Sequence, residues 1–149
     1  MSILFLAMGK KQKNLTILRD GLRKEGVRLT RQREALLCVL AEAKDHPDAE
    51  QLLVRARKID PKVSLTTVYR ALSIFEEQGL IDRLAFEGEA ARFEVNTNSH
   101  HDHIIDIDNG EITEFRNDLI EKIQEEIASR YGYELISHKL ELYCRKRKE

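Results

Sequence analysis

The chain has few cysteines and no long apolar run, and each absence excludes a class of protein. Cys38 and Cys144 are its only cysteines, so the sequence holds neither a CxxC pair nor a disulfide framework, as is typical of a reducing cytoplasm. No stretch reaches the roughly 18–20 apolar residues that a membrane-spanning helix requires. We therefore expect a cytoplasmic protein without a membrane segment.

The apolar run at residues 2–8 is too short for a signal peptide and lacks a basic leader and a cleavage site. Two interpretations of this run stay open. It is either an N-terminal arm or the product of an over-long gene start, with Met8 as the true first residue. We assign no function to it.

Charge is distributed unevenly along the chain, although the formal net charge is only −1. Residues 10–34 carry nine Lys or Arg against three acidic residues, whereas residues 94–143 carry twelve acidic residues against four basic ones. A basic front half is typical of phosphate contact and an acidic back half of cation binding. Two ordinary solvated faces are the alternative interpretation.

The first half predicts a winged helix-turn-helix, because helical patterns are followed by a hairpin signal. Leucines recur at helical spacing within residues 14–25, and the N-caps of three further helices are expected at Thr30, Asp48 and Ser64. Residues 80–86 and 91–95 then have the pattern of two strands, joined by a Glu-Gly-Glu turn. We place this DNA-binding domain at residues 10–95.

The second half predicts a small α/β unit over residues 99–149, after a polar hinge at residues 96–98. Asn109-Gly110 is a tight-turn signal between two strands, a helix pattern follows, and residues 133–144 alternate as a third strand. Because so short a unit leaves sheet edges exposed, we expect a homodimer. The fold class is therefore α+β, with a winged helix-turn-helix domain followed by a dimerisation domain.

The helix that follows Ser64 has the pattern of a recognition helix. If its apolar positions face the core, the residues left facing outward at its N-terminus are Thr66, Thr67, Tyr69 and Arg70. DNA-reading helices place their base contacts there, where Tyr and Thr can pack on thymine methyls and Arg can bond guanine or phosphate. Further backbone or minor-groove contacts are expected from Lys24, Arg28 and Arg31. The alternative is a surface helix with incidental polar residues.

The segment His100-His101-Asp102-His103 holds three of the five histidines around one carboxylate. A strand sends alternate side chains to opposite faces, so this segment would begin two separate metal sites. On one face, His101 and His103 would be joined by His46 and Glu94, and a metal there would fix the angle between the two halves.

On the opposite face, Glu121 and His138 would complete a site with His100 and Asp102. His138 lies in an apolar strand pattern, where a buried hydrogen-bonded histidine is the alternative interpretation. The mixed nitrogen and oxygen ligands suit Fe(II), Mn(II), Zn(II) or Co(II) and do not choose among them.

Together these motifs resemble the ferric uptake regulator (Fur) family over residues of about 22–143. The stretches that carry the resemblance are residues 64–72, 92–94, 100–103 and 108–115. The resemblance implies a metal-loaded dimer that occupies an AT-rich palindromic operator in double-stranded DNA and represses uptake genes. It implies a regulatory site of His46, Glu94, His101 and His103 with Glu114 nearby, and a second site of His100, Asp102, Glu121 and His138. It assigns DNA contact to Tyr69 and Arg70, and we count Ser64, the N-cap of the same helix, among the expected DNA-binding residues.

The chain departs from the family pattern in two places. Many members carry a CxxC for a structural zinc where this chain has residues 106–109, so we expect no cysteine-ligated structural zinc. Peroxide-sensing members tend to have Asp at the position of Glu94, which disfavours a redox sensor. The missing CxxC is similar to alphaproteobacterial members, some of which respond to manganese.

The sequence thus predicts a metal-dependent transcriptional repressor, with iron uptake genes as the first choice of target, activated by Fe(II) or Mn(II), with Zn(II) able to occupy the sites in vitro. A manganese- or zinc-responsive regulator of the same family is the first alternative, and a metal-binding or storage module without DNA regulation is another. An enzyme is disfavoured, because no independent base, nucleophile or oxyanion device accompanies the metal ligands.

Overall fold

The computed structural model describes residues 9–85, 88–96 and 100–148, and the chain divides into two compact units, residues 1–98 and 99–149. The apolar run at residues 2–8, the predicted turn residue Glu87 and the hinge residues 97 and 98 lie outside the described residues. Among the described residues, no helix is both long enough and apolar enough to cross a membrane.

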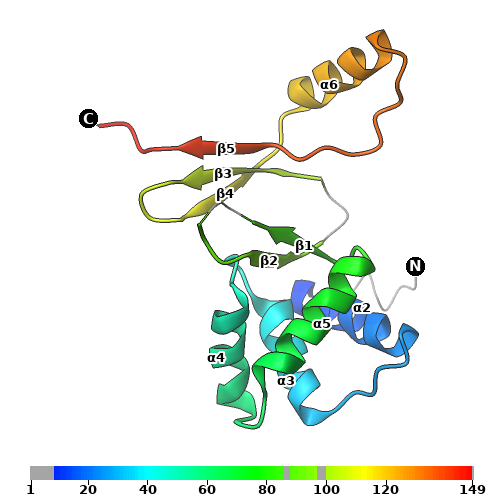
Figure 1. Ribbon diagram of the computed structural model, residues 1–149, viewed down its shortest axis with the longest axis vertical. Helices are drawn as coiled ribbons and strands as arrows, with labels where there is room; N and C mark the ends of the chain where they lie inside the picture. The colour runs from blue at the N-terminus through cyan, green and yellow to red at the C-terminus, as the bar shows by residue number, and fades with distance from the viewer. Residues whose placement is uncertain (1–8, 86–87, 97–99, 149) are drawn as a thin grey trace. The chain divides into compact units, whose positions relative to one another are not determined.

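The first unit is a helical bundle followed by a β-hairpin (Figure 1). Its elements are α2 (Lys10–Lys24), α3 (Arg31–Glu42), α4 (Ala49–Ile59), α5 (Leu65–Glu77), β1 (Ile81–Leu84) and β2 (Arg92–Val95). The predicted N-caps are present: Thr30 accepts from the Arg33 amide, Asp48 forms a capping box with Gln51, and Ser64 accepts from the Thr67 amide. These caps satisfy backbone donors that the first turn of a helix leaves without partners. The order of helices and hairpin confirms the winged helix-turn-helix.

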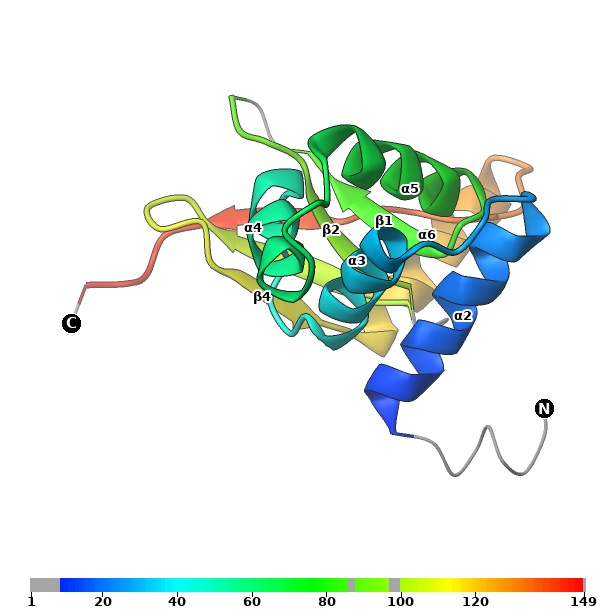
Figure 2. The same ribbon diagram turned by 90° about the horizontal axis from the view of Figure 1, so that it is seen from below.

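A single core holds this bundle together. Helices α2, α3, α4 and α5 gather around it (Figure 2), and the side chains of Leu22, Leu36, Leu52 and Phe75 are completely buried within it. Complete burial of one such side chain contributes roughly 1.5–3 kcal/mol. Because Val68, on the inner side of α5, is also completely buried, the orientation of this helix is fixed, and its opposite side faces solvent.

The hairpin is attached to the loop that precedes α4. Strands β1 and β2 are antiparallel, with Ile81 opposite Val95 and Leu84 opposite Arg92. The amide of Phe93 donates to the carbonyl of Pro47 at 2.9 Å, and Asp48 forms a β-bridge with Arg92. Strand β2 and this loop are therefore held side by side.

The second unit is a small mixed sheet with one helix. Its elements are β3 (Asp102–Asp106), β4 (Ile112–Phe115), α6 (Asp118–Arg130) and β5 (Glu141–Cys144). The strand order is β4-β3-β5, with β3 antiparallel to β4 and parallel to β5. The predicted Asn109-Gly110 turn lies in a hairpin loop that is wider than a two-residue turn, since the Asp106 amide donates to the Glu111 carbonyl and the Gly110 amide to the Asp106 carbonyl.

The prediction of one long strand over residues 133–144 was wrong, because only Glu141–Cys144 is a strand. Pairing explains the difference: β5 aligns with His103 to Asp106 of β3, and the amide of His103 reaches back only as far as the carbonyl of Leu140. Residues 133–140 have an alternating pattern, but their main chain has no strand to pair with in the described part of the unit. Ile136, in the middle of this segment, is 85% exposed.

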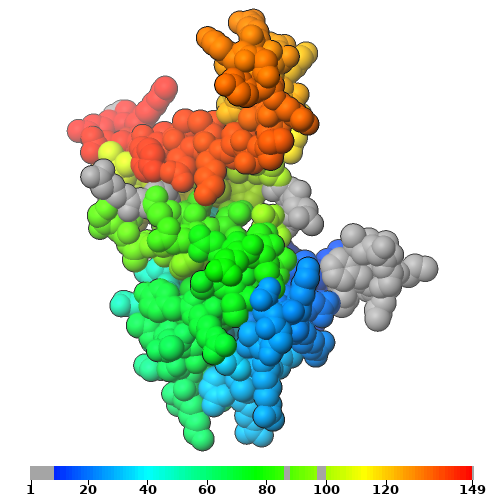
Figure 3. All heavy atoms as spheres, turned by 45° about the vertical axis from the view of Figure 1, so that its right-hand side comes forward, coloured from blue at the N-terminus to red at the C-terminus, as the bar shows by residue number. Residues whose placement is uncertain are grey.

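Helix α6 buries none of its residues. Leu119, Ile123 and Ile127 follow one another along one side of it and are 65%, 45% and 49% exposed. In Figure 3, the orange atoms of α6 stand out from the rest of the second unit. An apolar stripe left open on a short helix is typical of a surface that packs against another protein chain.

Candidate metal centres and nucleic-acid interface

The outward side of α5 carries the predicted DNA-contacting residues. Thr66, Tyr69 and Arg70 are exposed near its N-terminus, with Tyr69 at 53% exposure. Thr67 is only half-exposed, and its hydroxyl lies 3.0 Å from that of Ser64, so these two hydroxyls hold the start of the helix. The three cations expected to contact the DNA backbone, Lys24, Arg28 and Arg31, are all exposed.

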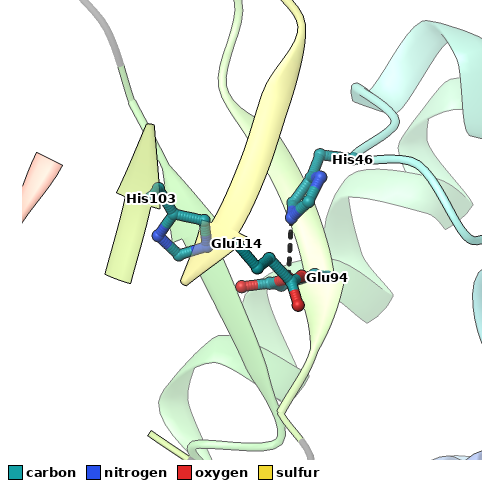
Figure 4. Close-up of side chains that lie close together, drawn as sticks. All are labelled: His46, Glu94, His103 and Glu114. Carbon is teal, nitrogen blue, oxygen red and sulfur yellow. Dashed lines mark hydrogen bonds and ion pairs between the residues drawn. The ribbon is translucent and has the colours of Figure 1, made fainter. Parts of the chain in front are cut away.

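His46 and Glu94 meet within the first unit. The Nε2 atom of His46 lies 2.7 Å from an Oε atom of Glu94, and the two side chains are 7% and 10% exposed (Figure 4). Both belong to the segments that the Phe93–Pro47 hydrogen bond joins, because His46 precedes Pro47 and Glu94 follows Phe93. A buried imidazole and carboxylate in contact provide two metal-ligand atoms from distant parts of the sequence.

Two arginines, whose contacts the sequence patterns did not predict, bind the loop at Asp45 and His46. The Nε atom of Arg92 donates to the main-chain carbonyl of His46 at 2.6 Å. The guanidinium of Arg55 binds both carboxylate oxygens of Asp45 and lowers the pKa of that carboxyl below its usual value. No local pattern reveals such contacts, since the partners lie far apart in sequence.

On the sheet of the second unit, His101, His103 and Glu114 gather at one place. His103 is directly opposite Glu114 in the β3–β4 register, so the two side chains lie on the same face (Figure 4). His101 Nε2 lies 3.5 Å from Glu114 Oε1, and the rings of His101 and His103 have their centroids 5.0 Å apart. This face of the second unit therefore presents two imidazoles and one carboxylate.

The structure brings His100, Asp102, Glu121 and His138 together within the second unit. One ligand atom from each lies within 4.8 Å of all the others. The Nε2 atoms of His100 and His138 are 2.9 Å apart, and they lie 3.0 and 3.2 Å from the same Asp102 oxygen. Glu121 Oε1 is 3.4 Å from the nitrogen of His100 and 3.6 Å from that of His138. These four residues form one cluster, the tetrad.

The polar atoms of the tetrad fit a divalent cation. Among the described residues, Asp102 Oδ2 and Glu121 Oε1 are buried without a hydrogen-bond partner. A buried acceptor without a partner costs roughly 1–3 kcal/mol, and more when it is charged. A cation bound by both oxygens and by the two imidazole nitrogens offsets this cost, and such a mixed ligand set suits Fe(II), Mn(II), Zn(II) or Co(II).

Residues 106–109, where a CxxC is absent, have another role in the structure. Asp106 accepts a hydrogen bond from the Asp108 amide, and Asn109 accepts one from the Glu111 amide. These side chains hold the main chain of the hairpin loop. Cys38 is half-buried in the first unit, and Cys144 is exposed in the second.

Residues 24–143 of the chain match the model of the ferric uptake regulator family. Among curated proteins, the chain is 52% identical over 127 residues to the ferric uptake regulation protein of Brucella abortus, covering 85% of this chain and 90% of that protein. It is 44% identical over 118 residues to the protein of the same name from Rhizobium leguminosarum, covering 79% and 83% of the two chains.

The solved structures that are similar to this chain include regulators of metal uptake. A zinc-bound manganese uptake regulator is similar with a TM-score of 0.69 and 41% identity, over 87% of this chain and 98% of that one. The ferric uptake regulator of Pseudomonas aeruginosa with manganese is similar with a TM-score of 0.75 and 39% identity, over 89% and 99%. The Helicobacter pylori ferric uptake regulator, described as having three functional metal binding sites, reaches 0.78 at 33% identity, over 91% and 92%.

Replacing His138 with alanine tests the tetrad as a metal centre. We expect the metal affinity of this site to fall by at least the roughly tenfold to hundredfold seen when an outer-shell partner of a metal ligand is lost. Equilibrium dialysis should then show less bound Mn(II) per chain at the lowest concentration that saturates the unaltered protein. The exposed neighbour Lys139, changed to alanine, is the matched control. Equal Mn(II) content in both variants would contradict a metal role for the tetrad.

Proposed function

The chain belongs to the ferric uptake regulator family, and we propose that it represses metal-uptake genes by binding operator DNA when loaded with Fe(II) or Mn(II). It is a metal-responsive transcriptional regulator and not an enzyme. Regulators of this family bind operator DNA, typically as dimers. The gene class, the activating ion, the AT-rich palindromic operator and a cytoplasmic location are part of the proposal.

One observation carries the proposal: each unit holds part of a ligand set. The first unit offers one imidazole and one carboxylate, from His46 and Glu94, and both are buried. The second offers His101, His103 and Glu114 on one face of its sheet. Since such ions take about four to six ligands, we infer that one regulatory ion is bound by ligands of both units.

Shared ligation links ion binding to DNA binding. A dimer reads a palindrome only when both recognition helices fit successive major grooves, about 34 Å apart. His46 and Glu94 belong to the unit that carries α5, whereas His101, His103 and Glu114 belong to the unit expected to dimerise. An ion held by these side chains would supply the positive charge that attracts the carboxylates of Glu94 and Glu114. Ligands that meet only in one arrangement favour that arrangement by differential affinity.

The tetrad is the second metal centre in this proposal, and it lies wholly within the second unit. Its role would be to hold α6 and the segment around His138 against β3, so that the dimer surface is ordered. We propose no structural zinc held by cysteines, since the dimer unit contributes only Cys144. Zn(II) would occupy either centre in vitro, because its ligand preferences overlap with those of Fe(II) and Mn(II).

Iron is the first choice for the activating ion, and manganese is the second. The curated relatives are ferric uptake regulation proteins, which supports iron. The structures of manganese uptake regulators, at 41% identity, support a manganese-responsive regulator as the second candidate. The ligands themselves, imidazoles and carboxylates without a thiolate, suit both ions.

Homodimerisation is proposed to involve the apolar stripe of α6. Leu119, Ile123 and Ile127 lie four residues apart, so they form one continuous side of the helix. Packing this side against a second copy of the chain would remove their exposed apolar surface from water. A two-fold symmetric dimer would also match a palindromic operator.

Replacing Glu94 with alanine should remove the metal dependence of DNA binding. The anisotropy of a labelled AT-rich palindrome is followed against the metal-stripped protein while Fe(II), Mn(II) or Zn(II) is titrated under anaerobic conditions at fixed salt. For the unaltered chain we expect tight binding only with metal. For Glu94→Ala we expect the weak binding of the metal-free protein at every metal concentration, because the regulatory ion has lost a buried ligand.

Glu89, an exposed carboxylate on the same hairpin, is the matched control for Glu94. Its replacement by alanine should leave the metal-dependent increase in affinity intact. If the unaltered chain binds the palindrome equally well with a chelator present, the metal sites are structural and the proposed switch is wrong.

Replacing Tyr69 with alanine should weaken operator binding without changing metal content. A side chain that contacts a base edge typically contributes about 1–3 kcal/mol of discrimination, so the affinity should fall by roughly tenfold to a hundredfold. The same anisotropy measurement gives the affinity, and equilibrium dialysis gives the Mn(II) content. A lower metal content would mean that Tyr69 supports folding instead of contacting DNA.

Replacing Ile123 with glutamate should convert the dimer to monomer, because a charge would have to be buried within the apolar stripe. Sedimentation velocity at micromolar chain concentration measures the change. Lys122→Glu, at an exposed position beside it, introduces the same side chain and should remain dimeric. A dimeric Ile123→Glu variant would place the interface elsewhere.

A further inference from the structure

We propose that Gln124 is a fifth ligand of the tetrad centre and makes that centre selective for Mn(II) and Fe(II) over Zn(II). The proposal rests on the tetrad being a metal centre, as proposed above. Its starting point is an unusual side chain: Gln124 Oε1 is buried, yet it has no hydrogen-bond partner among the described residues.

Burial of this atom is unexpected for its position in the chain. The neighbouring residues Lys122, Ile123, Glu125 and Glu126 are all exposed, and α6 contains no fully buried residue. The less exposed positions of the helix follow the helical repeat, namely Ile120, Glu121, Gln124 and Ala128. Gln124 therefore lies on the side of α6 that carries Glu121.

The spacing places Gln124 within reach of the tetrad. Residues three apart on a helix are neighbours, with Cβ atoms about 5–6 Å apart. Glu121, one turn earlier, already brings its Oε1 atom to 3.4 Å from His100 and 3.6 Å from His138. A glutamine side chain is as long as that of glutamate, so its carbonyl oxygen can reach the same ion.

Three side-chain oxygens of the second unit are buried acceptors that lack a donor among the described residues. They are Asp102 Oδ2, Glu121 Oε1 and Gln124 Oε1. A network that leaves several buried acceptors without donors is unfavourable in a protein interior. One cation bound by all three oxygens offsets the cost of all three, whereas a cation bound by the tetrad alone leaves the amide oxygen of Gln124 without a partner.

A fifth ligand changes which ions the centre favours. Structural zinc sites are almost always four-coordinate and tetrahedral, whereas manganese favours oxygen-rich sites with more ligands. Two imidazole nitrogens, two carboxylate oxygens and one amide oxygen form a mixed set beyond four. Gln124 therefore lowers the affinity of this centre for Zn(II) relative to Mn(II) and Fe(II).

The experiment uses the full chain with His46→Ala. This substitution lowers the metal affinity of the regulatory centre, so that the measured metal binding reports on the tetrad. Into this background we introduce Gln124→Met, which keeps the length of the side chain but removes the hard oxygen, and Gln124→Glu, which keeps an oxygen. Glu125→Met, at the exposed next position, is the matched control. Co(II) absorption reports coordination, and chelator competition gives the affinities for Mn(II) and Zn(II).

We expect Gln124→Met to lose on the order of tenfold or more in Mn(II) affinity, with a smaller loss for Zn(II). Its Co(II) spectrum should gain the stronger visible absorption of a four-coordinate tetrahedral ion. Gln124→Glu should keep the spectrum of the His46→Ala parent, and Glu125→Met should match the parent in every measurement. Metal-free Gln124→Met should unfold at no lower temperature than the parent, because the substitution removes an acceptor without a partner.

Unchanged Mn(II) affinity and an unchanged Co(II) spectrum in Gln124→Met would overturn the proposal and leave the tetrad in place as a four-ligand centre. A parent that binds no Co(II) at the tetrad would show that the centre itself fails, and the proposal with it. A metal-free Gln124→Met that unfolds at a lower temperature, without rescue by Gln124→Glu, would assign Gln124 a purely structural role and would also overturn the proposal.

Discussion

Burial of charged and polar groups without enough protein partners is the constraint on which the metal chemistry of this protein depends. The side chain of Asp102 is fully buried, and one of its oxygens has no hydrogen-bond partner among the described residues. Such an arrangement is unfavourable in the metal-free chain, because removing a carboxylate from water is costly unless it is paired. A cation bound by the proposed tetrad would make the burial of the same side chains favourable, and folding of the second unit and metal affinity would then be coupled.

The two proposed centres differ in how they use this coupling. The tetrad takes all its ligands from one unit, so its ion would stabilise that unit alone. The regulatory ligands are divided, with His46 and Glu94 in the unit that carries the recognition helix. An ion that needs ligands from both units converts metal concentration into a preference for one arrangement, and this is the physical content of a metal-dependent switch.

Local signals explain how much of the fold was predictable. Each predicted N-cap side chain accepts a hydrogen bond from an amide three residues further along the chain, so the signal is local. The strand pattern of residues 133–144 failed because a strand also needs a partner in register, and β3 pairs with Glu141 to Cys144 only. The resemblance to the ferric uptake regulator family is confirmed by the family model over residues 24–143.

The candidate sites were predictable to the extent that they depend on spacing. Successive side chains of a strand point to opposite faces, which predicts different sites for His103 and Asp102. In the structure His103 lies opposite Glu114, whereas Asp102 belongs to the tetrad. The contacts of Arg92 and Arg55 with the loop around His46 were not predictable, because they join residues distant in sequence. The burial of Gln124 Oε1 was not predictable either, because a glutamine among charged residues on a helix is typical of a solvent-exposed position.

The claim that one regulatory ion is bound by ligands of both units is tested most directly by single-molecule energy transfer within one chain. One dye is attached to the exposed Cys144 of the second unit and the other to Glu76→Cys in the first, with Cys38→Ala to prevent unwanted labelling and an excess of unlabelled chain. The account predicts that Mn(II) narrows the distribution of transfer efficiency, and that Glu94→Ala abolishes this effect. Identical distributions with and without Mn(II) would contradict it.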